Sequence, residues 1–245
     1  MVSHLGIIPG GSGNGLVHTI NNIYLDGNIS SNNIFDSTFH VIKGKPTEMD
    51  IVRFTTSSNK VYYSFLSFGW GLLSDVDIES EGLRCLGESR FAIWSIYRSF
   101  TLKKYSGTLS YLHADKVSVS IPPLGCSLNE SWVVEQGKFV MVYAAYQKFL
   151  NSTCKFAPDS KLDDQTIYLL FIKEGVSSCQ VIQFLLSLED GSHVKLPFVN
   201  FIPVRAFRLE PDKSSDIMTL DGELIECSAV QGEIYPKLAS ILMRS

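Results

Sequence analysis

The chain has 245 residues, of which 45% are hydrophobic and 19% are charged, and its formal net charge is −4. This composition predicts a folded protein with a sizeable core, organised as one large domain or two small ones. The acidic balance, together with the lack of any basic run, argues against nucleic-acid binding. No uncharged apolar stretch is long enough for a transmembrane helix.

The first predicted elements are a strand, a tight glycine-rich turn and a helix, all within HLGIIPGGSGNGLVHTI at residues 4–20. An apolar run from Leu5 to Ile8 leads into Pro9 and the glycines, and an apolar-spaced segment begins at Leu16. Glycines let the backbone approach a ligand, and N–H groups at a helix start attract phosphate. The spacing fits neither G-x-G-x-x-G nor a Walker A loop. The spacing alone therefore leaves phosphate binding and a plain structural turn equally open.

The remaining residues up to about position 46 are predicted to be α/β. We expect a helix at about residues 14–24, a surface loop at DGNISSNN, and a possible strand from Phe39 to Ile42. From about Asp50 the pattern changes, because short β-branched and aromatic runs alternate with turns, which predicts a β-sandwich. Val61–Phe68 is apolar throughout, so we interpret it as one central strand. The other predicted strands are Ile51–Thr55, Gly107–Leu112, Val117–Ile121, Phe139–Ala145, Ile167–Ile172, Phe198–Phe201, Arg205–Leu209, Ile217–Thr219 and Leu224–Cys227.

Two helical segments interrupt the predicted strands. Val181, Leu185 and Leu188 recur at helical spacing, with Ser177 or Ser178 as the N-cap. A second helical pattern runs from residue 80 to about residue 100, with a break near Gly87.

A charged segment lies within SFGWGLLSDVDIESEGLRCLGESRF, residues 67–91. Its acidic residues alternate, so in an extended chain they would point to one side: Asp75, Asp77, Glu79 and Glu81. Arg84 and Arg90 follow, and they could converge on one ligand only if the chain bends near Gly87. Guanidinium groups bind phosphate oxygens bidentately. The alternative, which the pattern alone favours, is a solvated network of acids and arginines.

A third signal is the sequence TLDGEL at residues 219–224, which predicts a β-hairpin with an Asp-Gly turn. On this signal alone, a plain hairpin is the favoured interpretation. The functional alternative is that Asp221 and Glu223 present carboxylates to a ligand or to a magnesium ion.

Taken together, PGGSGNGL, SFGWGLLSDVDIESEGLRCLGESRF, FRLEPDKSSDIMTLDGELIE and AVQGEIYP resemble the sphingosine kinases, within the diacylglycerol-kinase-like lipid kinase family. The likeness runs nearly end to end. It implies an α/β nucleotide-binding domain, a β-sandwich lipid-binding domain and an active site in the cleft between them. We accordingly predict that residues 1–47 are the C-terminal part of the α/β domain, that 48–233 form the sandwich, and that 234–245 return to the α/β domain.

The resemblance also implies roles for individual residues. Nucleotide phosphates would be held by Gly11, Ser12, Gly13, Arg84 and Arg90. The nucleotide would be bordered from the sandwich side by Asp221, Gly222 and Glu223. Asp77 would bind the polar head of the sphingoid base, and Phe91 would form part of the lipid pocket wall. We place the long tail in an apolar cavity inside the sandwich, lined by residues such as Phe68, Phe91, Leu185 and Val199.

The implied reaction is transfer of the γ-phosphoryl group of ATP, bound with Mg²⁺, to the primary hydroxyl of sphingosine. The family's Gly-Gly-Asp-Gly-type motif, whose aspartate is the general base, precedes the Gly-rich loop and is absent from this sequence. We therefore assign no catalytic residue and expect a C-terminal piece of a longer enzyme. The alternatives are a short isoform that binds or regulates without catalysis, and a kinase for ceramide or diacylglycerol. Asp77 argues against the neutral diacylglycerol head.

The compartment is predicted from cysteine usage and the substrate. Five scattered cysteines without CxxC spacing favour reduced thiols, and no signal-peptide pattern is seen. A substrate that resides in the bilayer favours a cytoplasmic protein with peripheral membrane contact. Phe91–Phe100 mixes aromatic and basic residues, among them Trp94, Tyr97 and Arg98, and is our candidate for that contact. The alternative is a gate helix packed over the pocket.

Overall fold

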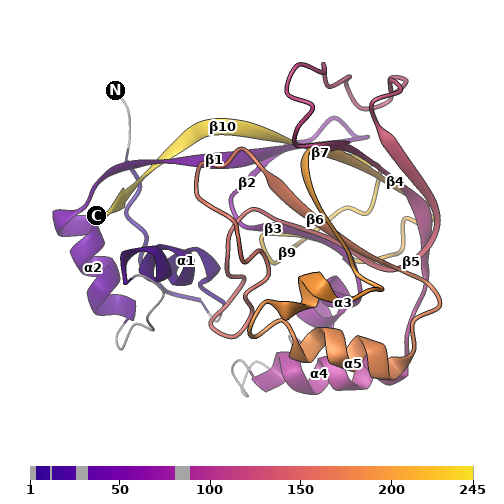
Figure 1. The fold of residues 1–245 in the computed structure, drawn as a ribbon, viewed down its shortest axis with the longest axis horizontal. Coiled ribbons are helices and arrows are strands. Elements are labelled where there is room, and N and C mark those ends of the chain that lie inside the picture. Colours follow the sequence, from indigo (N-terminus) through magenta and orange to yellow (C-terminus); the bar gives the residue numbers. More distant parts are fainter. Residues whose placement is uncertain (1–3, 12, 26–32, 81–88, 245) are drawn as a thin grey trace.

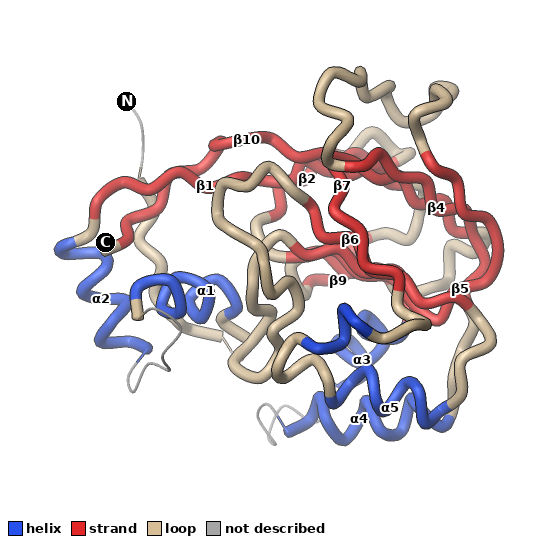
Figure 2. The backbone as a smooth tube through the Cα atoms, in the orientation of Figure 1, coloured by secondary structure: helices blue, strands red, loops and turns tan. Residues whose placement is uncertain are grey.

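The structure is a computed structural model that describes residues 4–11, 13–25, 33–80 and 89–244, with only the backbone described at residues 89–92. It is a mixed α/β fold built on a large antiparallel sheet, which confirms the predicted fold class (Figure 1). Helices α1 (Gly15–Tyr24) and α2 (Asn33–Lys43) lie at one end of the molecule. At the other end, three helices lie together beside the sheet: α3 (Leu72–Glu79), α4 (Ser89–Phe100) and α5 (Ser178–Leu186) (Figure 2).

The strands of the described residues form one sheet in the order β2-β1-β10-β7-β4-β5-β3-β8-β9, and β6 pairs with both β5 and β7. Strand β5 pairs with β4 through residues 133–139 and with β6 through residues 139–145. Strand β7 pairs with β6 through residues 200–204 and with β4 through residues 204–211. The sheet therefore folds over onto itself as two layers. The strands are β1 (Lys45–Thr56), β2 (Val61–Ser64), β3 (Ser67–Gly71), β4 (Tyr105–His113), β5 (Val133–Ala145), β6 (Ile167–Lys173), β7 (Asn200–Pro211), β8 (Met218–Leu220), β9 (Glu223–Ile225) and β10 (Val230–Met243).

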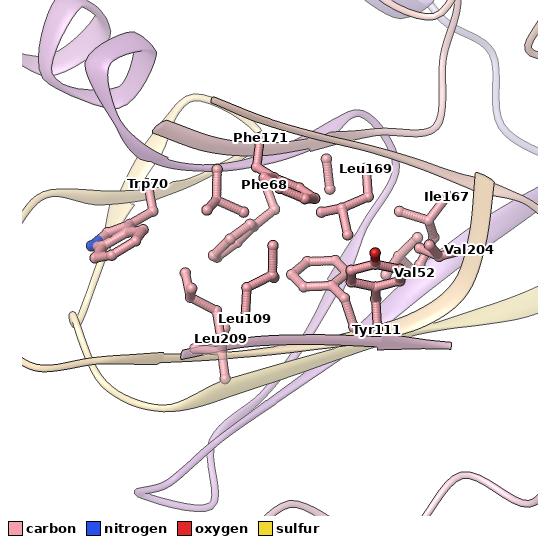
Figure 3. Packing of buried hydrophobic residues seen from close by; sticks show 14 of the residues in the cluster. Val52, Phe68, Trp70, Leu109, Tyr111, Ile167, Leu169, Phe171, Val204 and Leu209 are labelled. Carbon is pink, nitrogen blue, oxygen red and sulfur yellow. The ribbon is translucent and has the colours of Figure 1, made fainter. Parts of the chain in front are cut away.

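Aromatic side chains fill the space between the two layers (Figure 3). The rings of Phe54 and Phe68 stack at 5.3 Å, and Phe207 packs against both rings. Trp70 is fully buried beside them. The prediction that Phe68 lines a lipid cavity is therefore wrong, because its ring belongs to this packed core.

A second apolar cluster lies between the outer face of the sheet and the helices α3, α4 and α5. The start of α5 is fixed by a capping box, in which Gln180 N donates to Ser177 Oγ and Ser177 N donates to Gln180 Oε1. This confirms Ser177 as the N-cap. Val181 and Phe184 then point from α5 into the cluster. Val199, predicted to line the lipid cavity, packs at the edge of the same cluster.

Several predicted strands differ in the structure. The predicted strand Leu5–Ile8 makes only an isolated bridge, between Leu5 and Ile241. The runs Phe198–Phe201 and Arg205–Leu209 contribute to one strand, β7. The run Val61–Phe68 is divided into the edge strand β2 and the buried strand β3, so the prediction of one central strand is wrong. The possible strand from Phe39 to Ile42 is part of α2. Val117–Ile121 lies in the loop between β4 and β5, where Arg208 of β7 donates hydrogen bonds to the carbonyls of Pro123 and Cys126.

Strands β1 and β10 form a long antiparallel ribbon that connects the two ends of the molecule (Figure 1). The register shifts between Met49 and Ile51, where Asp50 of β1 lies opposite three residues of β10, 236–238, so the irregularity lies in β10. The buried Asp50 carboxylate accepts hydrogen bonds from Gln165 N at 2.6 Å and from Lys237 N at 2.8 Å. Burial raises the pKa of the Asp50 carboxyl, and the two hydrogen bonds oppose that rise.

His193 is expected to make stability depend on pH. Its ring is fully buried among aromatic rings, and Nε2 lies 2.9 Å from the carbonyl oxygen of Phe156. Burial lowers the pKa of His193 below its ordinary value of 6.5, although nearby Asp190 acts in the opposite direction. The unfolded chain therefore binds a proton near pH 6.5, whereas the folded protein does so only at lower pH. The free energy of unfolding falls with decreasing pH in this window, by at most about 1.4 kcal/mol per pH unit.

The measurement is urea unfolding at pH 7.5 and pH 5.5. His193→Gln keeps an amide donor for Phe156 but cannot titrate, so it should lose less stability on acidification than the wild-type chain. His4→Asn, at an exposed position, serves as the matched control. An equal pH dependence in the wild type and His193→Gln would contradict the prediction.

Candidate functional site

A cavity of about 870 Å³ lies where the glycine-rich segment meets the helices α3, α4 and α5. One wall comes from the glycine-rich segment and the start of α1. A second wall comes from the three helices, and a third from the turn between β8 and β9 together with the β2–β3 connection. The cavity therefore joins parts of the chain that are far apart in sequence. The cavity lies beside the sheet. We had predicted the lipid cavity inside the sandwich, between the two layers of the sheet.

Asn14 closes the glycine-rich segment. Its Oδ1 accepts hydrogen bonds from the backbone N–H groups of Gly10 and Gly11, at 3.2 and 3.0 Å, and its Nδ2 donates to the carbonyl oxygen of Gly11. Asn14 adopts a left-handed conformation with φ of 52°, which asparagine tolerates better than most residues. The amides of Gly10 and Gly11 are thus engaged within the loop. The anion-attracting groups that border the cavity are at Gly13 and at the start of α1.

The start of α1 is pressed against the β5–β6 connection. A Cβ atom at Gly15 would lie 2.5 Å from the carbonyl oxygen of Phe149 and 2.6 Å from that of Leu150. Only glycine fits this approach without movement of the backbone. The contact holds the helix start at the edge of the cavity, next to Leu150 and Asn151 on the opposing wall.

Asp221 organises the turn that faces the glycine-rich segment. Its Oδ1 accepts from Ser64 Oγ at 2.6 Å, from Leu66 N at 3.0 Å and from Ser67 N at 2.9 Å, and Oδ2 accepts from Phe65 N at 3.1 Å. Burial raises the pKa of the Asp221 carboxyl, while these four hydrogen bonds act in the opposite direction. The Asp221 carboxylate thus stabilises the β2–β3 connection, and both of its oxygens accept hydrogen bonds from that connection.

The predicted hairpin is present, because β8 and β9 pair across Asp221 and Gly222, which have φ of 51° and 83°. Glu223 is exposed and borders the cavity together with Gly222. Asp77 approaches this turn from α3, with Oδ2 3.5 Å from the position that a Cβ would take at Gly222. The structure therefore brings Asp77, the turn at 221–223, Gly11 and Gly13 to one cavity.

Asp75, Asp77 and Glu79 lie on the helix α3, so the extended conformation that we considered is wrong for these three residues. Glu81 lies outside the described residues. Asp75 is fully buried and pairs with Arg98 of α4 and with the hydroxyl of Tyr105. Glu79 accepts a hydrogen bond from Trp94 Nε1 at 2.9 Å and lies 3.3 Å from Arg98 Nε. Asp77 lies between Asp75 and Glu79 in the sequence of α3, and it borders the cavity. These carboxylates thus divide between fastening α4 to α3 and facing the cavity.

Arg98 lies inside the fold, which corrects its predicted place on a basic membrane-binding face. The outward side of α4 is apolar, with Ile93, Ile96, Tyr97 and Phe100 about half or more exposed. Ile96 also borders the cavity, beside Leu186 of α5. Among the described residues, no helix is both long and apolar enough to span a bilayer.

The deeper wall of the cavity is apolar. It includes Leu185, as predicted, together with Leu73, Val76 and Leu188. Cys154 lies on the same wall, and burial raises the pKa of its thiol to about 12, so the thiol is protonated at neutral pH. Next to it, the Tyr143 hydroxyl lies 3.1 Å from Ser67 Oγ, and burial, followed by the nearby Asp77 carboxylate, raises the pKa of this phenol.

The side chains of four predicted site residues lie outside the described part of the chain. Ser12 and Arg84 lie outside the described residues. Arg90 and Phe91 belong to α4, but their side chains lie outside the described part of the chain. Their roles toward nucleotide and lipid stay predictions.

Sequence reasoning did not single out Asn14 or Tyr143. Asn14 had a detectable signal, because an asparagine inside a glycine-rich turn often bonds to nearby backbone groups. Tyr143 had none, since its place on the cavity wall depends on which face of β5 meets the helices. Within the described residues, no group of three or more acidic, histidine or cysteine side chains is positioned to hold a metal ion.

The chain resembles known proteins over most of its length. The family model for the YegS C-terminal NAD kinase beta sandwich-like domain matches residues 106–243. The chain is 33% identical over 250 residues to sphingosine kinase 1 of Rattus norvegicus and 30% identical over 249 residues to sphingosine kinase 1 of Homo sapiens. Each alignment covers 94% of this chain and 65% of the relative.

Among solved structures, a diacylglycerol kinase from Bacillus anthracis str. Sterne matches with a TM-score of 0.60 and 13% identity, covering 98% of this chain and 67% of that chain. At this identity the match shows a shared fold. The chain thus spans somewhat less than two thirds of its rat and human relatives. It belongs to the family of the YegS C-terminal NAD kinase beta sandwich-like domain and is a homologue of the sphingosine kinases.

Proposed function

We propose that the cavity binds a sphingoid base, with its ammonium and hydroxyl head at Asp77 and its tail along the apolar wall of α3 and α5. The observation that carries this proposal is the position of Asp77, a carboxylate at the boundary between the apolar wall and the turn at 221–223. A carboxylate stabilises an ammonium and accepts hydrogen bonds from hydroxyls. The names of the rat and human relatives agree with such a ligand.

We further propose that ATP lies between the glycine-rich segment and the turn at 221–223. Gly13 and the start of α1 would offer N–H groups to its phosphates, and Gly11, whose amide bonds to Asn14, would line the phosphate site. Gly222 and Glu223 would border the nucleotide from the sheet. The predicted roles of Ser12, Arg84 and Arg90 belong to the same proposal. Bound Mg²⁺ would neutralise phosphate charge during phosphoryl transfer.

The reaction we propose is transfer of the γ-phosphoryl group to the primary hydroxyl of the sphingoid base. The hydroxyl proton needs an acceptor, and the family's Gly-Gly-Asp-Gly-type motif does not occur in this sequence. Binding can therefore be tested separately from catalysis. A chain that binds without transferring phosphate would correspond to the non-catalytic alternative.

The test is a titration of the 245-residue chain with fluorescent sphingosine. Asp77→Asn should weaken binding by about tenfold to a hundredfold, because it removes a charged hydrogen-bond partner worth about 1.5–3 kcal/mol. Asp115→Asn, on an exposed loop away from the cavity, is the matched control and should bind as the wild type does. Non-saturable binding, or equal affinity in Asp77→Asn and the wild type, would contradict the proposal. Thermal unfolding of each variant separates lost binding from lost folding.

A further inference from the structure

We propose that the hydroxyl groups of Tyr143 and Ser67 form a second polar contact for the base bound in the cavity, and that this contact favours a base with an additional hydroxyl on its chain, directly after the head. Tyr143 would then be a specificity-determining residue. The inference rests on the proposed function, because it names the class of sphingoid base that the same cavity takes. It concerns binding alone and does not depend on phosphoryl transfer.

Tyr143 is a polar residue in an apolar row of β5. Side chains alternate along a strand, so Met141, Tyr143 and Ala145 share the outer face of the sheet. Met141 and Ala145 are buried in the apolar cluster between the sheet and the helices α3, α4 and α5. Tyr143 is only partly buried at the edge of this cluster, and it borders the cavity. A hydroxyl in such a wall costs free energy unless it is hydrogen-bonded.

Packing fixes the position of the Tyr143 ring. Its strand partner on β3 is Gly69, where a Cβ atom would lie 2.7 Å from Tyr143 Cε2, so the ring lies directly on the glycine. The Phe156 ring packs against the Tyr143 ring with 4.9 Å between the ring centres. The ring has little room to turn aside, and its hydroxyl therefore keeps a fixed place beside the cavity.

The two hydroxyl groups have hydrogen-bonding capacity to spare. The Tyr143 hydroxyl lies 3.1 Å from Ser67 Oγ, and either oxygen can be the donor. This bond uses one of the two hydroxyl protons, and among the described residues neither hydroxyl has another hydrogen-bond partner. Both residues border the cavity. The second proton and the remaining lone pairs are therefore left for a polar group in the cavity.

The hydroxyl pair lies close to Asp77. The Cβ position of Gly69, which meets the Tyr143 ring, also meets Ser74 Oγ of α3. Ser74 and Asp77 are three positions apart on α3, so they are neighbours on one face of the helix. Burial raises the pKa of the Tyr143 phenol, and the negative charge of nearby Asp77 raises it further. A base whose ammonium meets Asp77 would thus have the first carbons of its chain beside the hydroxyl pair.

A hydroxyl on the chain carbon that follows the head suits this position. The head would meet Asp77, and the additional hydroxyl would exchange hydrogen bonds with Tyr143 and Ser67. A base that has only methylene groups there would exclude water from the pair without replacing its hydrogen bonds. A site with such polar groups disfavours an analogue that lacks the matching hydroxyl, because the buried groups are left unpaired.

The experiment measures how well two unlabelled bases displace fluorescent sphingosine from the 245-residue chain. Phytosphingosine and sphinganine are compared, because they differ only in the hydroxyl on the fourth carbon. The wild-type chain should bind phytosphingosine about tenfold more tightly, which corresponds to one net hydrogen bond. Tyr143→Phe keeps the ring and removes the hydroxyl, so it should weaken phytosphingosine binding by about tenfold and leave sphinganine binding nearly unchanged.

Two further variants make the result specific to the hydroxyl pair. Tyr146→Phe is the matched control, because it removes a hydroxyl that lies 2.7 Å from Ser64 Oγ and outside the described lining of the cavity. This variant should keep the preference. Ser67→Ala removes the other member of the pair and should also narrow the preference. Thermal unfolding of each variant shows whether it is folded.

Equal, saturable binding of both bases by the wild type would overturn this inference and leave the proposed function standing. The inference would also fail if the preference survived in Tyr143→Phe, or in Ser67→Ala should Tyr143→Phe not fold. An equal loss of preference in Tyr146→Phe would overturn it too, because general damage near β5 would then explain the result. If labelled sphingosine bound without saturation and neither base displaced it, the proposed function and this inference would fall together.

Discussion

Replacing Arg98 with methionine is expected to lower the free energy of unfolding by about 3–5 kcal/mol. Asp75, its partner, is fully buried on α3, and the guanidinium is nearly buried on α4. Without Arg98, the Asp75 carboxylate would keep only the Tyr105 hydroxyl among its side-chain partners. An unpaired charge in such a site is costly, because the carboxylate has lost its water as well as its counter-ion. The measurement is equilibrium urea unfolding followed by tryptophan fluorescence.

Two further variants separate the buried pair from general damage to α4. Lys104→Met removes a surface ion pair with Glu174, in which both side chains are about half exposed, and should cost under about 1 kcal/mol. The double variant Asp75→Leu with Arg98→Met removes both charges and should recover much of the lost stability. If Arg98→Met costs no more than Lys104→Met, the ion pair does not fasten α4 to α3.

Replacing Asp221 with alanine is expected to cost about 3 kcal/mol or more. The change leaves the N–H groups of Phe65, Leu66 and Ser67 without their acceptor. The N–H groups of Leu66 and Ser67 are part-buried, and each buried donor that loses its acceptor costs about 1–3 kcal/mol. Alanine also tolerates the left-handed backbone at this position less well than aspartate does. Urea unfolding measures the loss of stability, and hydrogen exchange of residues 65–67 should accelerate.

Two further variants, Asp221→Asn and Glu223→Gln, test whether the lost hydrogen bonds cause this loss of stability. Asparagine keeps one acceptor oxygen and the backbone preference, so its cost should be well below that of alanine. Glu223 borders the same cavity with an exposed side chain, so Glu223→Gln should change stability by about 0.5 kcal/mol or less. An Asp221→Ala variant as stable as Glu223→Gln would show that the four hydrogen bonds do not hold the β2–β3 connection.

The sequence correctly predicted those elements that are specified by residues close together in the chain. The Ser177 cap with Gln180, the helical spacing after it and the Asp-Gly turn at 221–222 each depend on residues within one turn of chain. The glycine-rich turn before α1 was predicted for the same reason. The motifs that placed Asp77 and the 221–223 turn near one another came from the family resemblance, and the structure brings these residues to one cavity.

The predictions that differ from the structure concern elements whose conformation depends on residues far away in the sequence. The break between β2 and β3 depends on Asp221, which is 154 positions away from Ser67 in the sequence. The inward direction of Arg98 depends on Asp75 and Tyr105, so a basic residue in an aromatic run was misinterpreted as a surface feature. The location of the cavity likewise depends on large aromatic residues that fill the space between the sheet layers. Neither the periodicity of a segment nor its composition determines these long-range contacts.

The irregularity in the ribbon of β1 and β10 has a consequence for the shape of the cavity. Met49 and Ile51, on either side of Asp50, border the cavity, and so does Ala239 of β10. The Asp50 carboxylate fixes the path of the chain at this point by accepting from the backbone N–H groups of Gln165 and Lys237. A substitution that removes this carboxylate is therefore expected to reshape the cavity wall as well as to destabilise the ribbon.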